Sequence, residues 1–315
     1  MSDKAVVASD VCRSFGDLRV LDSLSFTVPD RGVFGFLGVN GAGKTTTIRI
    51  LTGLLAADSG RIEIFGREPR QSQGRIGYLA QEPGFYAWMT ATEYCAMTAE
   101  LYGFSGRESL DRAERALKRV GLADAASRRV GGYSTGMKQR LGIAAATLHN
   151  PGLVILDEPV SSLDPVGRAE VLDLIRELGG QSAVLMSSHI LADVERIADQ
   201  VAIIHHGRII VQDHTASLKE KYLLPLLEIE VEGDVSGLTS ALSAAPFVRG
   251  VSLVGVDTAG VSLLRVTVTD VAAARDGIAA VIAGPAVRLH SLHSGSASLE
   301  DVFMGLVKAE TEAVR

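Results

Sequence analysis

The sequence predicts an α/β fold, with a mostly parallel sheet, followed by a smaller α+β domain of ferredoxin-like element order. Three observations lead to this prediction. Strand-like and helix-like segments alternate from Ala5 to about His214, which is typical of a parallel sheet with crossover helices. A glycine-rich loop at residues 38–45 separates a strand-like run from a helical one. After Lys221 the order changes to β-α-β-β-α-β, the split arrangement of ferredoxin-like domains.

The elements of the larger domain follow from short runs of strand formers and from helical spacing of apolar residues. Strands are expected at 33–37, 61–65, 76–80, 153–156, 183–187 and 201–205. Helices are expected at 46–55, 110–120, 134–148 and 165–178. Asp164 followed by Pro165 is typical of a helix N-cap with proline at the first helical position. Gly121, and Gly179 with Gly180, favour helix ends.

The same criteria define the smaller domain, which we expect to span 222–315 after a first domain of 1–221. Its strands are expected at 226–231, 248–256, 261–269 and 287–291, and its helices at 235–245, 271–282 and about 299–308. No catalytic set of residues occurs in it. His290 and His293 are candidate metal ligands, but two histidines at a polar strand end are more often solvated. A regulatory or dimer-supporting role is the simpler interpretation.

Composition limits the classes of function. The length of 315 residues suggests two domains, and 47% hydrophobic residues allow a substantial core. The net charge of −6 and the few aromatic residues argue against nucleic-acid binding. Cys12 and Cys95 lie far apart in sequence, which disfavours a disulfide framework and fits a reducing compartment. No apolar stretch approaches the ~20 residues of a membrane span, so a membrane function would need a span from another chain.

The loop from Gly38 to Thr45 matches G-x-x-x-x-G-K-[ST], the phosphate-binding loop. Its glycines allow successive backbone N–H groups to surround a polyphosphate, and the following helix directs its positive dipole end at the same anion. Lys44 is expected to reach the β- and γ-phosphates, and the Thr45 hydroxyl to bind Mg²⁺. A glycine-rich turn without function is the alternative, which the strand and helix on either side disfavour.

Two carboxylates follow the apolar run at 153–156. The carboxyl edge of an open α/β sheet is where ligands bind, so Asp157 is a candidate Mg²⁺ ligand. Glu158 is placed to accept a proton from an attacking water. Alone, the pair is equally well explained as the cap of the next helix, but beside a phosphate loop we prefer the catalytic interpretation.

Three weaker signals complete the candidate site. Gln81 follows a strand and can contact the metal or orient water. His189 ends another strand, where a neutral imidazole can donate a hydrogen bond to the γ-phosphate. Ser134 and Gly136 begin a long helical pattern, and such a helix start is a second anion site. Because only one lysine-bearing loop exists, both sites serve one nucleotide only if a second copy supplies the other half.

The order of these motifs resembles the nucleotide-binding subunit of an ATP-binding cassette (ABC) transporter. The resemblance covers about Ala5 to Lys221. The motifs that carry it are the phosphate loop, Gln81, Tyr133-Ser134-Thr135-Gly136-Met137, residues 153–158, Ser162-Leu163-Asp164 and His189. The family implies a P-loop ATPase domain with a helical subdomain at about 82–150, and ATP and Mg²⁺ as cofactors.

The resemblance also implies residue roles. Catalysis would involve Glu158, His189, Gln81 and Lys44, and Mg²⁺ would contact Thr45, Gln81 and Asp157. Phe15 resembles the aromatic residue that stacks on adenine, with Val20 beside it. The remaining nucleotide contacts would come from Asn40, Gly41, Ala42, Gly43, Lys44, Thr45 and Thr46 of one subunit and from Ser134 and Gly136 of the other.

The implied partners are a second nucleotide-binding subunit, most simply a homodimer, and an integral membrane permease. Asp164 resembles the loop that links the two sites across that dimer. The segment from Gln81 to Gly103 resembles the region that docks on the permease, so the chain would act at the cytoplasmic face of the cell membrane. Phe85, Tyr86 and Trp88 lie in this segment. The alternative interpretation is that these aromatic side chains belong to the hydrophobic core. No nucleic acid is expected.

Two departures and one further likeness refine the assignment. Thr135 stands where the family usually has glycine, and Met137 where it has glutamine; Pro159-Val160-Ser161-Ser162 also differs from the common Thr and Gly. These changes weaken the expectation of fast ATP hydrolysis, but they remove no charged catalytic group. The tyrosine-led signature and the segment Ser298-Leu299-Glu300-Asp301-Val302-Phe303 resemble a drug-resistance-type exporter subgroup.

We therefore expect the ATP-hydrolysing subunit of an ABC exporter. The alternatives are a soluble, non-transport ABC ATPase acting on translation or DNA, and a binding-only cassette. The first alternative is disfavoured because only one phosphate loop and no long coiled coil occur. The second would predict loss of Glu158 or His189, and both are present. The cargo is chosen by the permease and has no signal in this chain.

Overall fold

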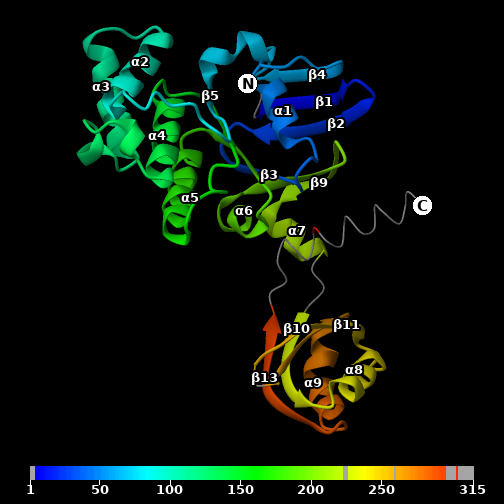
Figure 1. Cartoon of the computed structure of the whole chain (residues 1–315). Coiled ribbons are helices and arrows are strands. Elements are labelled where there is room, and N and C mark those ends of the chain that lie inside the picture. The colour runs from blue at the N-terminus through cyan, green and yellow to red at the C-terminus, as the bar shows by residue number, and fades with distance from the viewer. Residues whose placement is uncertain (1–3, 223–225, 259, 296–302, 304–315) are drawn as a thin grey trace. The chain divides into compact units, whose positions relative to one another are not determined.

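A computed structural model describes residues 4–222, 226–258, 260–295 and 303. The chain divides into two compact units, Met1–Thr215 and Ala216–Arg315 (Figure 1). The units are described separately. Within the described residues, no helix combines the length and the apolar character needed to cross a membrane.

A six-stranded sheet forms the centre of the first unit, in the order β5-β6-β7-β3-β8-β9. In chain order its strands are β3 (Gly32–Leu37), β5 (Ile76–Leu79), β6 (Leu153–Asp157), β7 (Ala183–Ser188), β8 (Gln200–His205) and β9 (Arg208–His214). All neighbours pair in parallel except β8 and β9. Strand β6 is buried along its whole length, as expected for an apolar strand covered on both faces. The predicted α/β class with a mostly parallel sheet is confirmed.

A second, antiparallel sheet corrects one expectation. It joins β1 (Lys4–Phe15), β2 (Leu18–Pro29) and β4 (Ser59–Ile64) in the order β2-β1-β4. The run expected at 61–65 as part of the parallel alternation is therefore β4 of this separate sheet. The two sheets share a core, since the ring of Phe26 lies 6.2 Å from that of Phe34 and 5.3 Å from that of Phe36.

Helices surround these sheets, and side chains cap the starts of α2, α4 and α5. They are α1 (Lys44–Leu51), α2 (Ala91–Leu101), α3 (Arg107–Arg119), α4 (Thr135–Thr147), α5 (Pro165–Gly179) and α6 (Leu191–Ile197), with single 3₁₀ turns at Pro69–Gln71, Gln73–Arg75, Ala123–Ala125 and Val130–Gly132. Figure 1 shows α2 and α3 at one end of the unit and the antiparallel sheet at the other. Asp164 caps α5 as expected, because its Oδ1 accepts a hydrogen bond from Gly167 N at 2.7 Å.

Helix α2 was not expected, although its start carries a clear signal. Thr90 and Glu93 form a reciprocal capping box: Glu93 N donates to Thr90 Oγ1 at 3.2 Å, and Thr90 N donates to Glu93 Oε2 at 2.7 Å. This pairing satisfies two backbone donors that a helix start otherwise leaves free.

The second unit begins with α7 (Thr215–Tyr222) at the boundary and contains a four-stranded antiparallel sheet. Its elements are β10 (Leu226–Gly233), α8 (Val235–Ser243), β11 (Val248–Val256), β12 (Ser262–Val268), α9 (Val271–Ile282) and β13 (Val287–Gly295). The strand order β11-β12-β10-β13 is that of a ferredoxin-like domain. Alternate residues of β10 and β12, such as Ile229 and Leu264, join Leu238 and Ile278 in its core. The helix expected at about 299–308 lies outside the described residues.

Candidate nucleotide-binding site

The phosphate loop connects β3 to α1 and depends on glycine geometry. Gly41 and Gly43 have φ angles of 82° and 110°, which residues with a side chain rarely adopt. A Cβ added at Gly38 would lie 2.6 Å from the backbone oxygen of Ile204. The loop can therefore turn its backbone N–H groups toward an anion only because these positions lack side chains.

Lys44, in the first turn of α1, lies almost completely buried at the base of this loop. Only 6% of Lys44 is exposed. Its Nζ donates to the carbonyl oxygen of Gly38 at 2.7 Å and lies 3.2 Å from Glu158 Oε1. The ammonium group is thus held between the phosphate loop and the end of β6.

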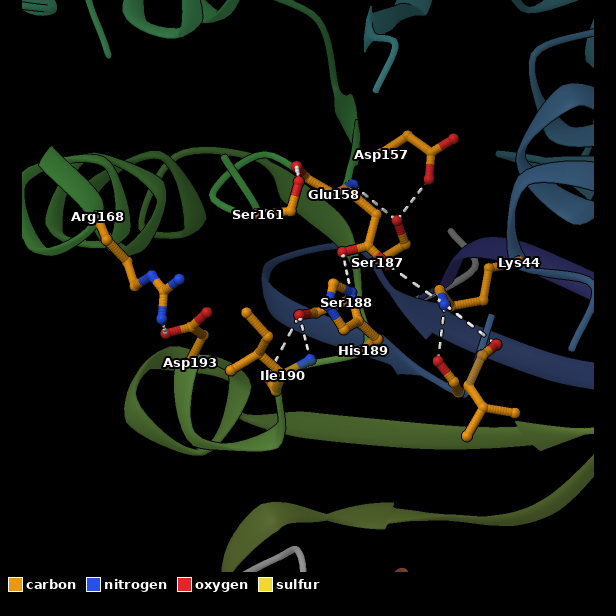
Figure 2. Close-up of polar contacts among 12 residues, drawn as sticks. Lys44, Asp157, Glu158, Ser161, Arg168, Ser187, Ser188, His189, Ile190 and Asp193 are labelled. Atoms are coloured by element: carbon orange, nitrogen blue, oxygen red, sulfur yellow. Dashed lines mark hydrogen bonds and ion pairs between the residues drawn. The ribbon is translucent and has the colours of Figure 1, made fainter. Parts of the chain in front are cut away.

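Ser187 on β7 organises the two carboxylates at the end of β6 (Figure 2). Its Oγ donates to Asp157 Oδ1 at 2.6 Å and accepts from Glu158 N at 2.9 Å. All three residues are buried. No role was predicted for Ser187 from the sequence, although it lies two residues before His189, near the end of β7, which was an available signal.

Glu158 links the cation of the loop to the histidine of the next strand end. His189 follows β7, and its Nδ1 lies 2.9 Å from Glu158 Oε2, while Glu158 Oε1 faces Lys44. Glu158 is only 6% exposed and has a φ of 50°. A non-glycine residue in the left-handed region is uncommon, and such backbone strain clusters at functional sites.

A cavity of about 480 Å³ brings most of the expected nucleotide contacts together. Its lining residues are Leu18, Val20, Asn40, Gly41, Gly43, Lys44, Thr45, Thr46, Gln81, Glu158 and His189. Ala42 is buried beneath the loop and does not line the cavity. Phe15 does not line it either: it is 48% exposed, pairs with Leu18 across the β1–β2 turn and lies under the Arg13 guanidinium, 4.8 Å from its ring centre.

The helix start at Ser134 lines a different cavity, of about 460 Å³. Thr135, Gly136 and Asp164 also line it. The Ser134 Oγ accepts a hydrogen bond from Met137 N at 3.3 Å, so it caps α4. Within one chain, Ser134 and Lys44 therefore face separate spaces.

The donor set at the end of β6 fits a magnesium ion that is bound together with a nucleotide. Asp157 Oδ2 is buried and has no hydrogen-bond partner among the described residues. Burial, and then the charge of Asp157, raise the pKa of Tyr78 on β5. No group of three or more His, Cys, Asp or Glu side chains in the described residues forms a metal cage. Mg²⁺ commonly takes one or two protein oxygens and completes its shell with phosphates and water, which Thr45 and Asp157 would permit.

The aromatic residues after Gln81 lie in a loop ahead of α2. Trp88 is 67% exposed, Tyr86 is also exposed, and their ring centres lie 5.9 Å apart. Phe85 is partly buried against Tyr94 of α2, with 5.1 Å between ring centres. Exposed neighbouring aromatic side chains are typical of protein interfaces.

Comparisons with known proteins agree on one family. A family model described as ABC transporter matches residues 21–161. The chain is 43% identical over 241 residues to the uncharacterized ABC transporter ATP-binding protein YxlF of Bacillus subtilis, covering 76% of this chain and 80% of that protein. It is 32% identical over 317 aligned positions to the daunorubicin resistance ATP-binding protein DrrA2 of Streptomyces coeruleorubidus, covering 99% and 98%. A solved structure, described as the ATP-binding subunit of an ABC transporter, has a TM-score of 0.62 and 31% identity, covering 69% of this chain and 93% of that one.

Proposed function

This chain belongs to the ABC transporter family of ATP-binding proteins, and from that premise we propose that it couples ATP hydrolysis to export through a separate membrane permease. The observation that carries the proposal is the Lys44–Glu158–His189 arrangement at the phosphate loop, in which Lys44 and Glu158 are buried and the His189 side chain is 41% exposed. It combines an anion-binding cation, a proton acceptor and a hydrogen-bond donor within one site. The soluble alternative has no support among these relatives.

Binding begins at the phosphate loop. The loop N–H groups and Lys44 would hold the β- and γ-phosphates, and Val20 with Leu18 offers an apolar surface to the base. Lys44 now neutralises Glu158, so the arriving phosphates compete with that carboxylate for the ammonium group. Mg²⁺, held by Thr45 and Asp157, would neutralise phosphate charge as the bond breaks. Gln81 lines the same cavity and is placed to orient water.

Hydrolysis needs no covalent intermediate. Glu158 accepts a proton from water as the water oxygen bonds to the γ-phosphorus, and the bond from that phosphorus to the bridging oxygen breaks. The electron pair of the broken bond leaves with ADP. Once Glu158 carries that proton, its O–H can donate to His189 Nδ1, which lies 2.9 Å from Oε2, and the neutral imidazole then donates from Nε2 to a γ-phosphate oxygen. Ser187 holds the backbone of Glu158 in place for this step.

Each nucleotide would be closed over by a second copy of the chain. Ser134 and Gly136 face a space separate from that of Lys44, so one chain offers two half-sites. In a head-to-tail homodimer, the helix start of one copy would bind the phosphates held by the other. ATP would then favour dimer closure, and hydrolysis would favour opening.

The permease would dock on the segment from Gln81 to Gly103, through Tyr86 and Trp88. Docking there would put the chain at the cytoplasmic face of the membrane. Export is supported by the daunorubicin resistance named for the relative that matches almost the whole chain. Residues 222–315 would form the accessory domain of the subunit.

Two measurements test the proposal. Purified chain should release phosphate from Mg-ATP, and this rate should change when a multi-span membrane protein encoded beside it is co-expressed and co-purified. Phosphate release without any co-purifying membrane protein would favour the soluble alternative. No phosphate release in either preparation would leave only a binding function and overturn the proposed catalytic roles.

A further inference from the structure

Arg168 and Asp193 face each other outside the nucleotide cavity, across the contact between α5 and α6 (Figure 2). Arg168 lies in the first turn of α5, and its Nη1 is 3.9 Å from Asp193 Oδ1. Asp193 is only 6% exposed. Burial of a carboxylate is unfavourable to folding unless the group is paired and hydrogen-bonded, so the geometry of this ion pair matters.

The pair lies one helical turn from each of two functional loops. Arg168 N donates to the carbonyl oxygen of Asp164 at 2.9 Å, which ties the arginine to the loop expected to link the two sites of a dimer. On the other side, Ser188 Oγ accepts from Ile190 N at 2.9 Å. That short turn carries His189 directly into α6, whose first turn contains Asp193. Moving Asp193 therefore moves the base of the His189 turn.

The two side chains are only partly engaged. Arg168 Nε and Asp193 Oδ2 are both buried and have no hydrogen-bond partner among the described residues. At 3.9 Å the recorded contact is an ion pair and too long for a hydrogen bond. A side-on approach of the guanidinium would satisfy both orphan atoms with two parallel N–H···O bonds. Because Nη1, and not Nε, is the atom that contacts Asp193, this pairing requires the guanidinium to turn together with a small closing movement between α5 and α6.

The charge environment connects Asp193 to the catalytic residues. Burial raises the pKa of Asp193, and the charges of Arg168, His189 and Arg196 oppose that rise in this order. Glu158 adds a smaller raising effect. Asp193 is therefore electrostatically coupled to His189 and to Glu158 even though it does not line the nucleotide cavity.

A second ion pair between α5 and α6 lies at the surface and serves as a comparison for the Arg168–Asp193 pair. Arg196 Nη2 donates to Asp173 Oδ1 at 2.8 Å, and both side chains are largely exposed. Exposed pairs of this kind contribute little to stability. Asp173 provides a matched control, because it joins the same two helices without burial and without orphan atoms.

We propose that Arg168 and Asp193 are positioning residues for His189. Side-on closure of their ion pair fixes the start of α6 relative to the Asp164 loop and holds the imidazole where it meets the γ-phosphate. The position of the Asp164 loop, which a dimer partner would influence, is thereby transmitted to the histidine. The inference rests on the proposed ATPase function.

The test compares steady-state ATP hydrolysis by the full chain and its variants. Arg168→Gln and Asp193→Asn should each lower kcat about tenfold and change KM for ATP less than about twofold, as expected for a positioning effect. The double variant should lose no more than either single variant, because both remove one interaction. Arg168→Lys should not restore kcat, since a point charge cannot pair side-on. Asp193→Glu should restore it in part. Asp173→Asn should stay within about twofold of the parent chain.

The outcomes separate this inference from the proposed function. If the parent chain and Asp173→Asn hydrolyse ATP but Arg168→Gln and Asp193→Asn do so equally well, the positioning role is wrong and the ATPase stands. A full rescue by Arg168→Lys, or a loss confined to KM, also contradicts it. If the parent chain itself releases no phosphate, the proposed function fails first. Thermal unfolding of each variant identifies any that fails to fold, and the conservative Lys and Glu variants then decide.

Discussion

Lys44 and Glu158 form a buried ion pair with 3.2 Å between Nζ and Oε1, so the cation proposed to bind phosphate is in contact with the proposed proton acceptor. Each charge compensates for the burial of the other, because an unpaired charge at this depth would be strongly unfavourable. On the proposed function, nucleotide binding and activation of Glu158 would be linked, because phosphates that attract Lys44 would free the carboxylate to accept a proton.

Replacing Glu158 by glutamine should separate binding from hydrolysis. The amide keeps the shape of the side chain but cannot accept the proton, so kcat should fall by about 100-fold or more. ATP binding should persist, and the variant should accumulate as a dimer with Mg-ATP on size-exclusion chromatography. A Glu158→Gln monomer that hydrolyses ATP at the parent rate would remove Glu158 from its proposed role.

Lys44→Met should have the opposite effect, with ATP affinity as the first property lost. The apolar chain fills the same space, but the phosphates lose their cation and the buried carboxylate of Glu158 loses its lysine partner. We expect ATP affinity to fall at least about 100-fold in a titration with a fluorescent ATP analogue. Lys118→Met, in the last turn of α3, removes an exposed lysine away from both half-sites and should bind normally. Equal affinity in both variants would contradict the phosphate contact.

Ser187→Ala should weaken catalysis through orientation of the carboxylates. The substitution leaves Asp157 Oδ1 and Glu158 N without their shared partner, which costs about 1–3 kcal/mol of stability. We expect a several-fold lower kcat and a higher Mg²⁺ requirement, measured by phosphate release across a magnesium titration. Ser182→Ala removes a comparable hydroxyl contact to Pro151, away from the site, and should leave the Mg²⁺ requirement unchanged.

His149 should make stability depend on pH. Burial lowers its pKa to about 4, below the usual value near 6.5, and its ring stacks on Tyr102 at 3.7 Å. Between these values the unfolded chain binds the proton and the folded chain does not, so stability is lost as pH falls from about 6.5 toward 4. Allowing for solvent screening, we expect a loss of about 1–2 kcal/mol.

Urea unfolding of the parent chain and of His149→Phe at pH 7 and pH 5 measures this contribution. The phenyl ring keeps the stacking on Tyr102, so the variant should lose less stability than the parent between the two pH values. His214→Gln, at the exposed end of β9, is the control. An identical pH dependence in all three chains would show that His149 does not contribute.

The aromatic pair ahead of α2 should matter for assembly and not for folding. Tyr86→Ser with Trp88→Ser should leave the melting temperature nearly unchanged, because both side chains are exposed. Recovery of the permease on purification should fall about tenfold, since aromatic residues often dominate interface energies. Leu54→Ser removes another exposed apolar side chain and serves as the control. Full recovery with the double variant would place the docking surface elsewhere.

The sequence predicted those elements whose pattern is local. The phosphate loop, the apolar strand before Asp157 and the Asp164 cap of α5 all depend on residues close together in the chain. Strand β4 was assigned to the wrong sheet because its partner, β1, lies about 50 residues earlier, and pairing between distant strands leaves no local pattern. Helix α2 was missed although Thr90 and Glu93 mark its start.

In the candidate site, too, local motifs were predicted and contacts between distant segments were not. Lys44, Glu158 and His189 were each predicted from motifs, but their mutual contacts were not, because they come from three different segments. No role was predicted for Ser187 or Asp193, because a serine in a strand and an aspartate in a short helix are both common. Their roles follow only from burial and from the atoms they face.

The positive φ of Glu158 also bears on how this chain would respond to selection for heat resistance. Glycine, and to a lesser degree asparagine, suits this backbone conformation better than glutamate, by about 1 kcal/mol. The residue that best suits the folded backbone at position 158 therefore differs from the residue that best suits ATP turnover. A library screened only for survival at high temperature should therefore enrich inactive chains at residue 158, unless ATP turnover is screened at the same time.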